Sequence, residues 1–328
     1  MVALDALLTL QDLEADLARV EAALRSAVEA GDPFMTTVAS HLVPAGGKRL
    51  RPALAVCVGR LASPGGVPVA QDVVMGACAV ELVHLGSLYH DDVMDEARTR
   101  RNVESVNSRW GNLVAILAGD FLLARASEIA ASLGAEVAGL LATTIGSLCE
   151  GQVRELSQAY DLGRSEEAYL VSISGKTGAL MATSCRIGAL TAGLPRDAVE
   201  AFTRYGESLG MVFQIVDDIL DVVCTDEELG KPAGNDLVEG VYTLPVIRAL
   251  ASSGTADSLR PLLGRHISAD AVHEARRIIR CNGAVPAALD VARAYAKEAV
   301  AALDGFGDGL ELEALRALTA NLTDSVPA

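Results

Sequence analysis

Aromatic side chains and positive charge are both scarce in this sequence. Phe, Trp and Tyr make up 4% of the 328 residues, and 27 Lys and Arg stand against 43 Asp and Glu, which gives a formal net charge of −16. Such a chain repels phosphate backbones and anionic bilayers at long range, so nucleic acid is not expected as a partner. The hydrophobic residues, 51% of the chain, are mainly Ala, Leu and Val, a composition typical of closely packed helices.

The sequence also lacks the patterns of an exported or membrane-spanning protein. Its six cysteines are widely spaced with no C-x-x-C pair, which favours buried, reduced thiols over disulfides or a zinc site. The first twenty residues carry four acidic side chains and lack the order of a signal peptide. No uninterrupted apolar run reaches the length of about 18 residues that spans a bilayer. We therefore expect a soluble, cytoplasmic protein without a transmembrane segment.

Apolar residues at three- and four-residue steps predict helices along the whole chain. The first thirty residues show one amphipathic pattern that stops near Gly31, and Asp32 followed by Pro33 is typical of a new helix start. No strand of useful length, repeat or low-complexity linker interrupts the series. We predict an all-α fold, a single large helical bundle that forms one domain over residues 1–328. Further helices are expected at 50–61, 70–95, 112–133, 135–158, 165–174, 177–192, 197–224, 241–251, 270–281, 286–304 and 310–321.

Two of the predicted helices carry the same D-D-x-x-D cluster of carboxylates. At about 100° per residue, the first and last aspartates of each cluster lie one above the other, with the second beside them. Unpaired carboxylates on apolar helices are costly, and a divalent cation bound through oxygen relieves both their repulsion and their desolvation. One such cluster alone could be a solvated acidic face of a helix. Two clusters at the same spacing on apolar helices are not well explained in that way. The candidate metal ligands are Asp91, Asp92 and Asp95 in the first cluster and Asp217, Asp218 and Asp221 in the second.

Basic residues stand beside these acidic motifs. Mg²⁺ typically joins one or two protein carboxylates to substrate phosphates, so a magnesium site of this kind predicts cations nearby. Any one of them alone could be a solvated side chain, but their placement in an acidic chain favours contacts to a diphosphate. The cations in question are Lys48, Arg49 and Arg51 after a Gly-Gly turn, Arg100 and Arg101 after the first cluster, Lys176 after Gly175, and Lys231 after Gly230.

The order of these motifs resembles that of the trans-type isoprenyl diphosphate synthases, also called polyprenyl synthetases. The resemblance runs from about Gly46 to Pro245 and includes G-K-R-x-R-P at 47–52, both aspartate motifs, G-K-T at 175–177, Gln214, and G-K-P-x-G-x-D-L at 230–237. It implies a homodimeric, all-α bundle of the isoprenoid synthase type. In that family three Mg²⁺ ions link the aspartates to an allylic diphosphate.

The resemblance also implies a role for each matched residue. Asp91 and Asp95 would bind two Mg²⁺ ions and Asp217 a third, and these aspartates with Lys176 would be the catalytic residues. The other three aspartates of the motifs would help directly or through water. The allylic diphosphate would be held by Arg100, Lys176, Thr177, Gln214 and Lys231. Isopentenyl diphosphate would be held by Lys48, Arg51, His84 and Arg101.

The chemistry that the resemblance implies is a head-to-tail condensation. Metal ions and cationic side chains neutralise the diphosphate leaving group, so the allylic C–O bond ionises and the double bond of isopentenyl diphosphate attacks the cation. Loss of a proton from the resulting cation forms the new double bond and completes the added unit. Apolar helix walls exclude the water that would trap this cation. We expect a Mg²⁺-dependent trans-polyprenyl diphosphate synthase.

Other functions use some of the same motifs. A class I terpene cyclase also has an aspartate-rich helix and Mg²⁺, but it ordinarily lacks G-K-R-x-R-P and the second D-D-x-x-D. Intact aspartates at all six positions argue against a catalytically silent partner subunit. The chain departs from the family at Asn102 and Val241, where glycine and lysine are common, and its end lacks a basic tail. None of these departures removes a metal ligand.

The residues before the first aspartate motif bear on product length. Each isoprene unit is comparable in length to one helical turn of about 5.4 Å, so a tail growing down this helix passes the side chains four and five residues before Asp91. Those residues are Ser87 and Gly86, both small, and the next ones, Val83, Leu82 and Ala79, are not aromatic. This pattern predicts a long-chain product, with a short-chain geranylgeranyl or farnesyl diphosphate as the alternative.

Overall fold

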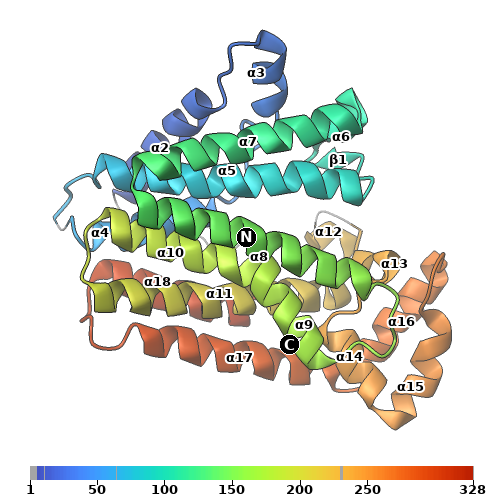
Figure 1. Ribbon diagram of the computed structural model, residues 1–328. Coiled ribbons are helices and arrows are strands. Elements are labelled where there is room, and N and C mark those ends of the chain that lie inside the picture. The colour runs from blue at the N-terminus through green and yellow to red at the C-terminus, as the bar shows by residue number, and fades with distance from the viewer. Residues whose placement is uncertain (1–5, 11, 64, 230–231, 328) are drawn as a thin grey trace.

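The structure, a computed structural model, describes residues 6–10, 12–63, 65–229 and 232–327. These ranges contain long helices that pack side by side and one pair of two-residue strands (Figure 1). The elements are α2 (Leu13–Ala27), α3 (Pro33–Ala39), α4 (Leu50–Arg60), α5 (Gln71–Met94), β1 (Thr99–Arg100), β2 (Val103–Glu104), α6 (Val106–Trp110), α7 (Asn112–Ser132), α8 (Ala135–Ser157), α9 (Glu166–Ile173), the π-helical turn η1 (Ser174–Gly178), α10 (Ala179–Thr191), α11 (Arg196–Val223), α12 (Asp226–Leu229), α13 (Asn235–Glu239), α14 (Leu244–Ala251), α15 (Ser253–Leu259), the 3₁₀ turn η2 (Arg260–Leu262), α16 (Ala269–Cys281), α17 (Ala284–Ala302) and α18 (Leu310–Asp324).

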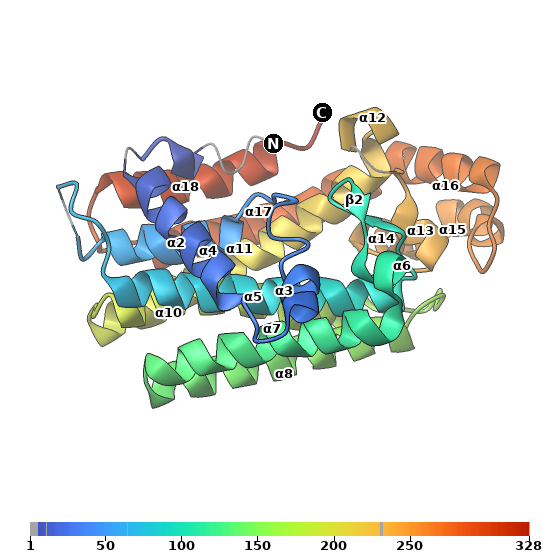
Figure 2. The same ribbon diagram turned by 90° about the horizontal axis from the view of Figure 1, so that it is seen from above.

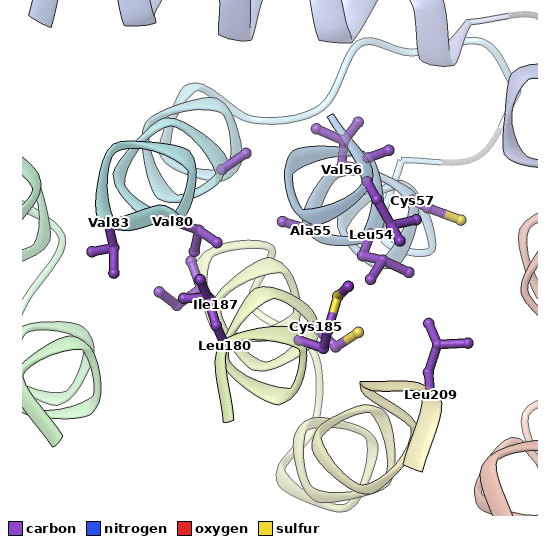
Figure 3. Packing of buried hydrophobic residues seen from close by; sticks show 14 of the residues in the cluster. Leu54, Ala55, Val56, Cys57, Val80, Val83, Leu180, Cys185, Ile187 and Leu209 are labelled. Atoms are coloured by element: carbon purple, nitrogen blue, oxygen red, sulfur yellow. The ribbon is translucent and has the colours of Figure 1, made fainter. Parts of the chain in front are cut away.

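The apolar faces of neighbouring helices form the core. Helix α5 packs most extensively against α7, and α11 packs against α10 and α17. In the centre of the bundle, Val80 and Val83 of α5 face Leu180 and Ile187 of α10 (Figure 3). A smaller apolar cluster around Tyr242 joins α13, α14, α15 and α16. The all-α prediction is confirmed.

The first predicted helix is wrong in part. Residues 9 and 10 lie in a turn and a bend, and α2 begins only at Leu13; residues 1–5 of the prediction lie outside the described residues. The start of α3 is as predicted, because Asp32 Oδ1 accepts a hydrogen bond from the backbone N–H of Phe34 at 2.8 Å. Periodicity did not reveal α6, α12, α13 and α15, since elements of four to seven residues are too short to show it.

A small hairpin between α5 and α6 is a further element that the sequence pattern does not predict. Strand β1 pairs with β2, and the turn between them places Arg101 at φ 52° and Asn102 at φ 63°. Asparagine visits this left-handed region more readily than most residues, so Asn102 fits the position where the resembling family often has glycine. The hairpin thereby positions Arg100 and Arg101 beside the end of α5.

Helix α5 is the one described helix that is long and apolar enough to cross a membrane by length and composition. Inside the protein, 72% of its most apolar window is buried. Glu81 and His84 also interrupt the apolar run. Burial of this kind is typical of the central helix of a packed bundle.

All six cysteines are free. Cys57, Cys78, Cys185 and Cys224 are buried, which agrees with the expected thiols. Cys149 and Cys281 are exposed, so the expectation of burial is wrong for these two.

Close contact between α10 and α4 depends on Gly188. The glycine lies against the backbone of Ala55 so tightly that a Cβ atom would overlap the Ala55 carbonyl oxygen. Because neither backbone can move without its helix, we expect Gly188→Ala to lower the free energy of unfolding by about 2 kcal/mol or more. Thermal or denaturant unfolding followed by circular dichroism measures this loss.

Gly139 offers a matched control in α8. Nothing lies within 4 Å of the position its Cβ atom would occupy. Alanine there should raise the free energy of unfolding by about 0.5–1 kcal/mol, because it only improves helix propensity. If alanine at Gly188 and alanine at Gly139 changed the free energy of unfolding by similar amounts, the contact between α10 and α4 would not explain the loss of stability at Gly188.

Candidate active site

The two aspartate-bearing helices end at the same end of the bundle. The hairpin, α12 and α13 lie around the carboxyl ends of α5 and α11 (Figures 1 and 2). A cavity of about 880 Å³ lies there, lined by Asp91 and Asp95 of α5 and by Gln214 and Asp217 of α11. Six more predicted site residues share its wall, namely Lys48, Arg51, His84, Arg100, Arg101 and Lys176.

The three aspartates of the first motif have different surroundings. Asp92 is fully buried, and its Oδ1 accepts hydrogen bonds from Arg100 Nε at 2.7 Å and Nη2 at 2.6 Å. Asp91 and Asp95 instead line the cavity. Burial raises the pKa of Asp91 to about 6, and nearby Asp95 adds to the rise while Lys176 opposes it. Carboxylates crowded in a place with little water favour a bound cation.

The second motif divides in the same way. Asp218 is buried and accepts hydrogen bonds from Tyr169 Oη at 2.6 Å and from Gln214 Nε2 at 2.8 Å. Asp221 is also buried, and its Oδ2 accepts a hydrogen bond from the backbone N–H of Asp236 at 3.4 Å. Asp217 lines the cavity. One aspartate of this motif and two of the first therefore face the cavity, while Asp92, Asp218 and Asp221 hold neighbouring groups.

A chain of hydrogen bonds links α9 to η1 through the buried aspartate of α11. Thr177 Oγ1 donates to Gln214 Oε1 at 2.7 Å, and the Gln214 amide donates in turn to Asp218. Asp218 thus orients two residues that the resemblance assigns to the allylic diphosphate. Tyr169, which completes the chain, carries no signal in the sequence, because a single tyrosine in an apolar stretch is ordinary core.

Lys176 reaches the cavity from the π-helical turn η1. Its Nζ donates a hydrogen bond to Glu155 Oε1 of α8 at 2.6 Å. Burial lowers the pKa of Lys176, but the contact with Glu155 and the nearness of Asp91 and Asp95 raise it overall. The ammonium group therefore stays charged beside the aspartates. Glu155 is a second site residue that sequence reasoning missed, since nothing in its spacing connects it to Lys176.

The glycine-rich loop before α4 contacts the turn of the hairpin. Gly47 has φ 133°, and a Cβ atom there would lie 2.6 Å from Arg101 Cζ. The Arg101 guanidinium donates a hydrogen bond to the carbonyl of Gly46. Burial lowers the pKa of His84 well below its usual value, and the adjacent Arg51 and Arg101 lower it further, so its imidazole is neutral. The predicted contact at Lys231 lies outside the described residues.

A second, mainly apolar cavity of about 490 Å³ adjoins the polar one. The two share Arg51, His84, Leu88, Asp91 and Lys176. Its wall continues from Ser87 of α5 to α7 and α8, where the lining residues are Ile116, Asp120, Leu148, Cys149, Gln152, Val153 and Leu156. Thr177 also lines this cavity. A substrate with a charged head and an apolar tail could therefore occupy both spaces.

The predicted course of the tunnel along α5 needs correction. Gly86 faces α7, and a Cβ atom there would lie 3.1 Å from the Gly119 carbonyl oxygen. Its small size serves helix contact, and only Ser87 of the two small residues lines the apolar cavity. Val83, Leu82 and Ala79 are fully buried and are not among the residues that line it. The cavity leaves α5 after His84 and runs between α7 and α8.

The chemistry of the cavity aspartates fits Mg²⁺. Among the described residues, no three His, Cys, Asp or Glu side chains converge into a ready-made metal site. Mg²⁺ needs only one or two protein carboxylates and completes its shell with water and substrate phosphates. Asp91, Asp95 and Asp217 offer carboxylate oxygens alone, which suit this hard cation. The site is therefore suited to metal ions that arrive together with a diphosphate.

Known proteins are similar to this chain in sequence and fold. The model of the polyprenyl synthetase family matches residues 32–279. The nonaprenyl diphosphate synthase of Mycobacterium tuberculosis is 41% identical over 289 residues, which cover 88% of this chain and 85% of that one. The structure of a polyprenyl synthase from Caulobacter crescentus, complexed with calcium and isoprenyl diphosphate, superimposes with a TM-score of 0.90 at 35% identity and 99% coverage of both chains. A geranylgeranyl pyrophosphate synthase from Corynebacterium glutamicum, also with calcium and isoprenyl diphosphate, gives a TM-score of 0.84 at 38% identity and 96% coverage of both.

The fold and the joined cavities define an enzyme that handles isoprenoid diphosphates. The family match extends over most of the chain, from the start of α3 to α16. The chain belongs to the polyprenyl synthetase family and is a prenyltransferase.

We expect Asp91→Ala and Asp217→Ala to reduce prenyl transfer by orders of magnitude without unfolding the protein. Each change removes a cavity carboxylate rather than a packing group. Turnover of labelled isopentenyl diphosphate and thermal unfolding should be measured together. Asp197→Ala, an exposed change in the first turn of α11, is the control and should keep nearly full activity. Near-normal turnover by a folded Asp91→Ala protein would contradict the metal assignment.

Proposed function

We propose that this chain is a Mg²⁺-dependent, long-chain trans-polyprenyl diphosphate synthase. It condenses isopentenyl diphosphate head-to-tail with an allylic diphosphate, in the cytoplasm. The observation that supports this proposal most directly is that Asp91 and Lys176 line both the polar and the apolar cavity. A diphosphate at the aspartates thereby has its prenyl tail directed between α7 and α8.

Two different sets of side chains would bind the two diphosphates. Asp91, Asp95 and Asp217 would hold Mg²⁺, which when bound supplies positive charge to the diphosphate leaving group. Lys176 adds a fixed cation next to two of these aspartates. Across the cavity, the neutral His84 and the cations Lys48, Arg51 and Arg101 would bind isopentenyl diphosphate. The calcium and isoprenyl diphosphate in the related Caulobacter crescentus structure support this arrangement.

Relatives and the cavity wall both support a long product. The relatives include the nonaprenyl synthase and a heptaprenyl diphosphate synthase component 2 from Geobacillus stearothermophilus, 42% identical over 240 residues. No Phe, Tyr or Trp is among the described residues that line the apolar cavity. A geranylgeranyl product is the second candidate, because the Corynebacterium glutamicum structure superimposes nearly as well.

A product assay decides between these candidates. The enzyme is incubated with labelled isopentenyl diphosphate, an allylic primer and Mg²⁺, and the dephosphorylated products are separated by chromatography. Chains of about six or more isoprene units are expected, because no Phe, Tyr or Trp is among the described residues that line the apolar cavity. Accumulation at four units would favour the geranylgeranyl alternative. Cyclic hydrocarbons without use of isopentenyl diphosphate would indicate a terpene cyclase.

Ser87→Phe should shift the products sharply towards short chains. Ser87 lines the apolar cavity one helical turn before Asp91, so a phenyl ring there blocks a tail after one or two added units. Ser87→Ala is the matched control and should leave the product distribution unchanged. A folded, active Ser87→Phe enzyme with unaltered products would show that the tail takes another route.

We also propose that the enzyme is a homodimer joined through α7 and α8. These helices expose Leu113 (79%), Leu117 (58%), Val153 (64%) and Leu156 (52%). Apolar side chains gathered on neighbouring helices mark a contact surface. The apolar cavity opens at the same face, where Val153 and Leu156 line it, so a second copy would also shield the prenyl tail from water.

Light scattering should give a mass twice that of the 34.1 kDa chain. Leu117→Glu should weaken the dimer, because it places a charge in the buried contact. Leu310→Glu, a change at the 69% exposed first residue of α18, is the control and should leave the mass unchanged. A monomer across the working concentration range would contradict the dimer, and equal effects of both variants would contradict the α7–α8 contact.

A further inference from the structure

Arg49 of the glycine-rich loop is held by two carboxylates from different parts of the chain. Its Nη1 donates a hydrogen bond to Glu81 Oε1 of α5 at 2.8 Å. Its Nε donates to Glu21 Oε1 of α2, and its Nη2 lies 3.4 Å from Glu21 Oε2. The same Nη2 donates to the carbonyl of Val43 at 2.8 Å. All three nitrogens of the guanidinium are therefore engaged by the protein.

The backbone at Arg49 also depends on these contacts. The residue has φ 47°, a left-handed conformation that side chains with a Cβ atom rarely adopt. It stands at the junction between the loop and α4, with Lys48 before it and Arg51 two residues after it. A side chain anchored at three points keeps this conformation, and the conformation sets the direction of Lys48 and Arg51.

Glu81 is the buried member of the pair. Its side chain is 2% exposed, against 28% for Glu21, and it lies one helical turn before His84 on α5. Burial raises the pKa of Glu81, while the charges of Arg49, Arg51 and Arg101 oppose the rise. One carboxylate thus faces three guanidinium groups on the wall of the polar cavity. Without it these cations would repel one another in a place with little water.

Lys48 contrasts with Arg49. It is exposed and, in the described part of the chain, makes no hydrogen bond or ion pair with another side chain. Arg51 has a buried Nε atom without a hydrogen-bond partner among the described residues. Of the three cations at the junction of the loop and α4, Arg49 is therefore bound by the protein, while Lys48 and Arg51 keep donors available for a ligand.

We propose that Glu81 and Glu21 are positioning residues for isopentenyl diphosphate: they clamp Arg49, and the clamp fixes the junction between the loop, which carries Lys48, and the first turn of α4, which carries Arg51. This inference rests on the proposed function, since it concerns the second diphosphate of that reaction. It also gives α2 a part in the site, although the family match begins only at residue 32.

The test separates positioning from simple charge. Glu81→Gln makes the cavity more positive, whereas Arg49→Gln makes it more negative. If only charge mattered, the two changes would move the KM for isopentenyl diphosphate in opposite directions. Because both break the clamp, we expect both to raise that KM by about tenfold, the effect of losing one hydrogen bond to a charged group. The KM for the allylic diphosphate should stay within about twofold, because its described contacts lie on β1, η1 and α11.

Three further variants keep the test decisive. Asp16→Asn removes a buried carboxylate from Arg60, which lies 2.7 Å away at the other end of α4, so it should lower Tm without changing either KM. Glu21→Gln breaks the clamp at its more exposed partner, so it should raise the KM for isopentenyl diphosphate even if Glu81→Gln does not fold. Glu81→Asp should restore part of the lost affinity.

The failure of this inference is distinct from failure of the proposed function. If the wild-type enzyme does not condense isopentenyl diphosphate, the proposed function is wrong. If it does, and folded Glu81→Gln or Glu21→Gln enzyme has an unchanged or lower KM for isopentenyl diphosphate, the clamp has no positioning role. A rise of the same size in Asp16→Asn would also overturn it, because general loss of stability would then explain the effect.

Discussion

The active site depends on giving a protein partner to each buried charge that substrate and metal do not use. Asp92 has Arg100, and Asp218 has Tyr169 and Gln214. Buried charges without partners are unstable in a helical bundle, so these pairs decide which groups can face the cavity. The second aspartate of each motif accepts hydrogen bonds from neighbouring protein side chains, and the first aspartate lines the cavity.

Helix contacts at glycines make this arrangement rigid. Gly188 brings α10 against α4, and Gly86 brings α5 against Gly119 of α7. Close backbones leave little freedom for α5 to rotate, so Asp91 stays directed at the cavity while Tyr89 and Asp92 remain in the core. The same packing closes the space below His84. The apolar cavity therefore follows α5 only from His84 to Met94, and α7 and α8 form much of the rest of its wall.

Much of the fold and of the site could be predicted from the sequence. The long helices follow apolar periodicity, and the cations and the first aspartates of both motifs meet at one cavity as expected. Periodicity could not show that Gly86 faces α7 rather than a tunnel, because a small residue fits either role. Likewise, identical aspartates at identical spacing do not show which one meets Arg100 or Tyr169. Those partners come from the hairpin and α9, whose positions depend on tertiary packing.

The chain is acidic overall, but this does not prevent it from binding diphosphates, because basic side chains are gathered on the wall of the cavity. The net charge of −16 is spread over the whole molecule, and solvent ions screen it over roughly 8–10 Å. Inside the cavity, where screening is weak, Lys48, Arg51, Arg100, Arg101 and Lys176 stand on the wall. A diphosphate meets these cations only after it has entered, and the proposed metal ions would offset the repulsion between the allylic diphosphate and the aspartates. The positive charge that a diphosphate meets therefore follows from where the charges lie rather than from their total.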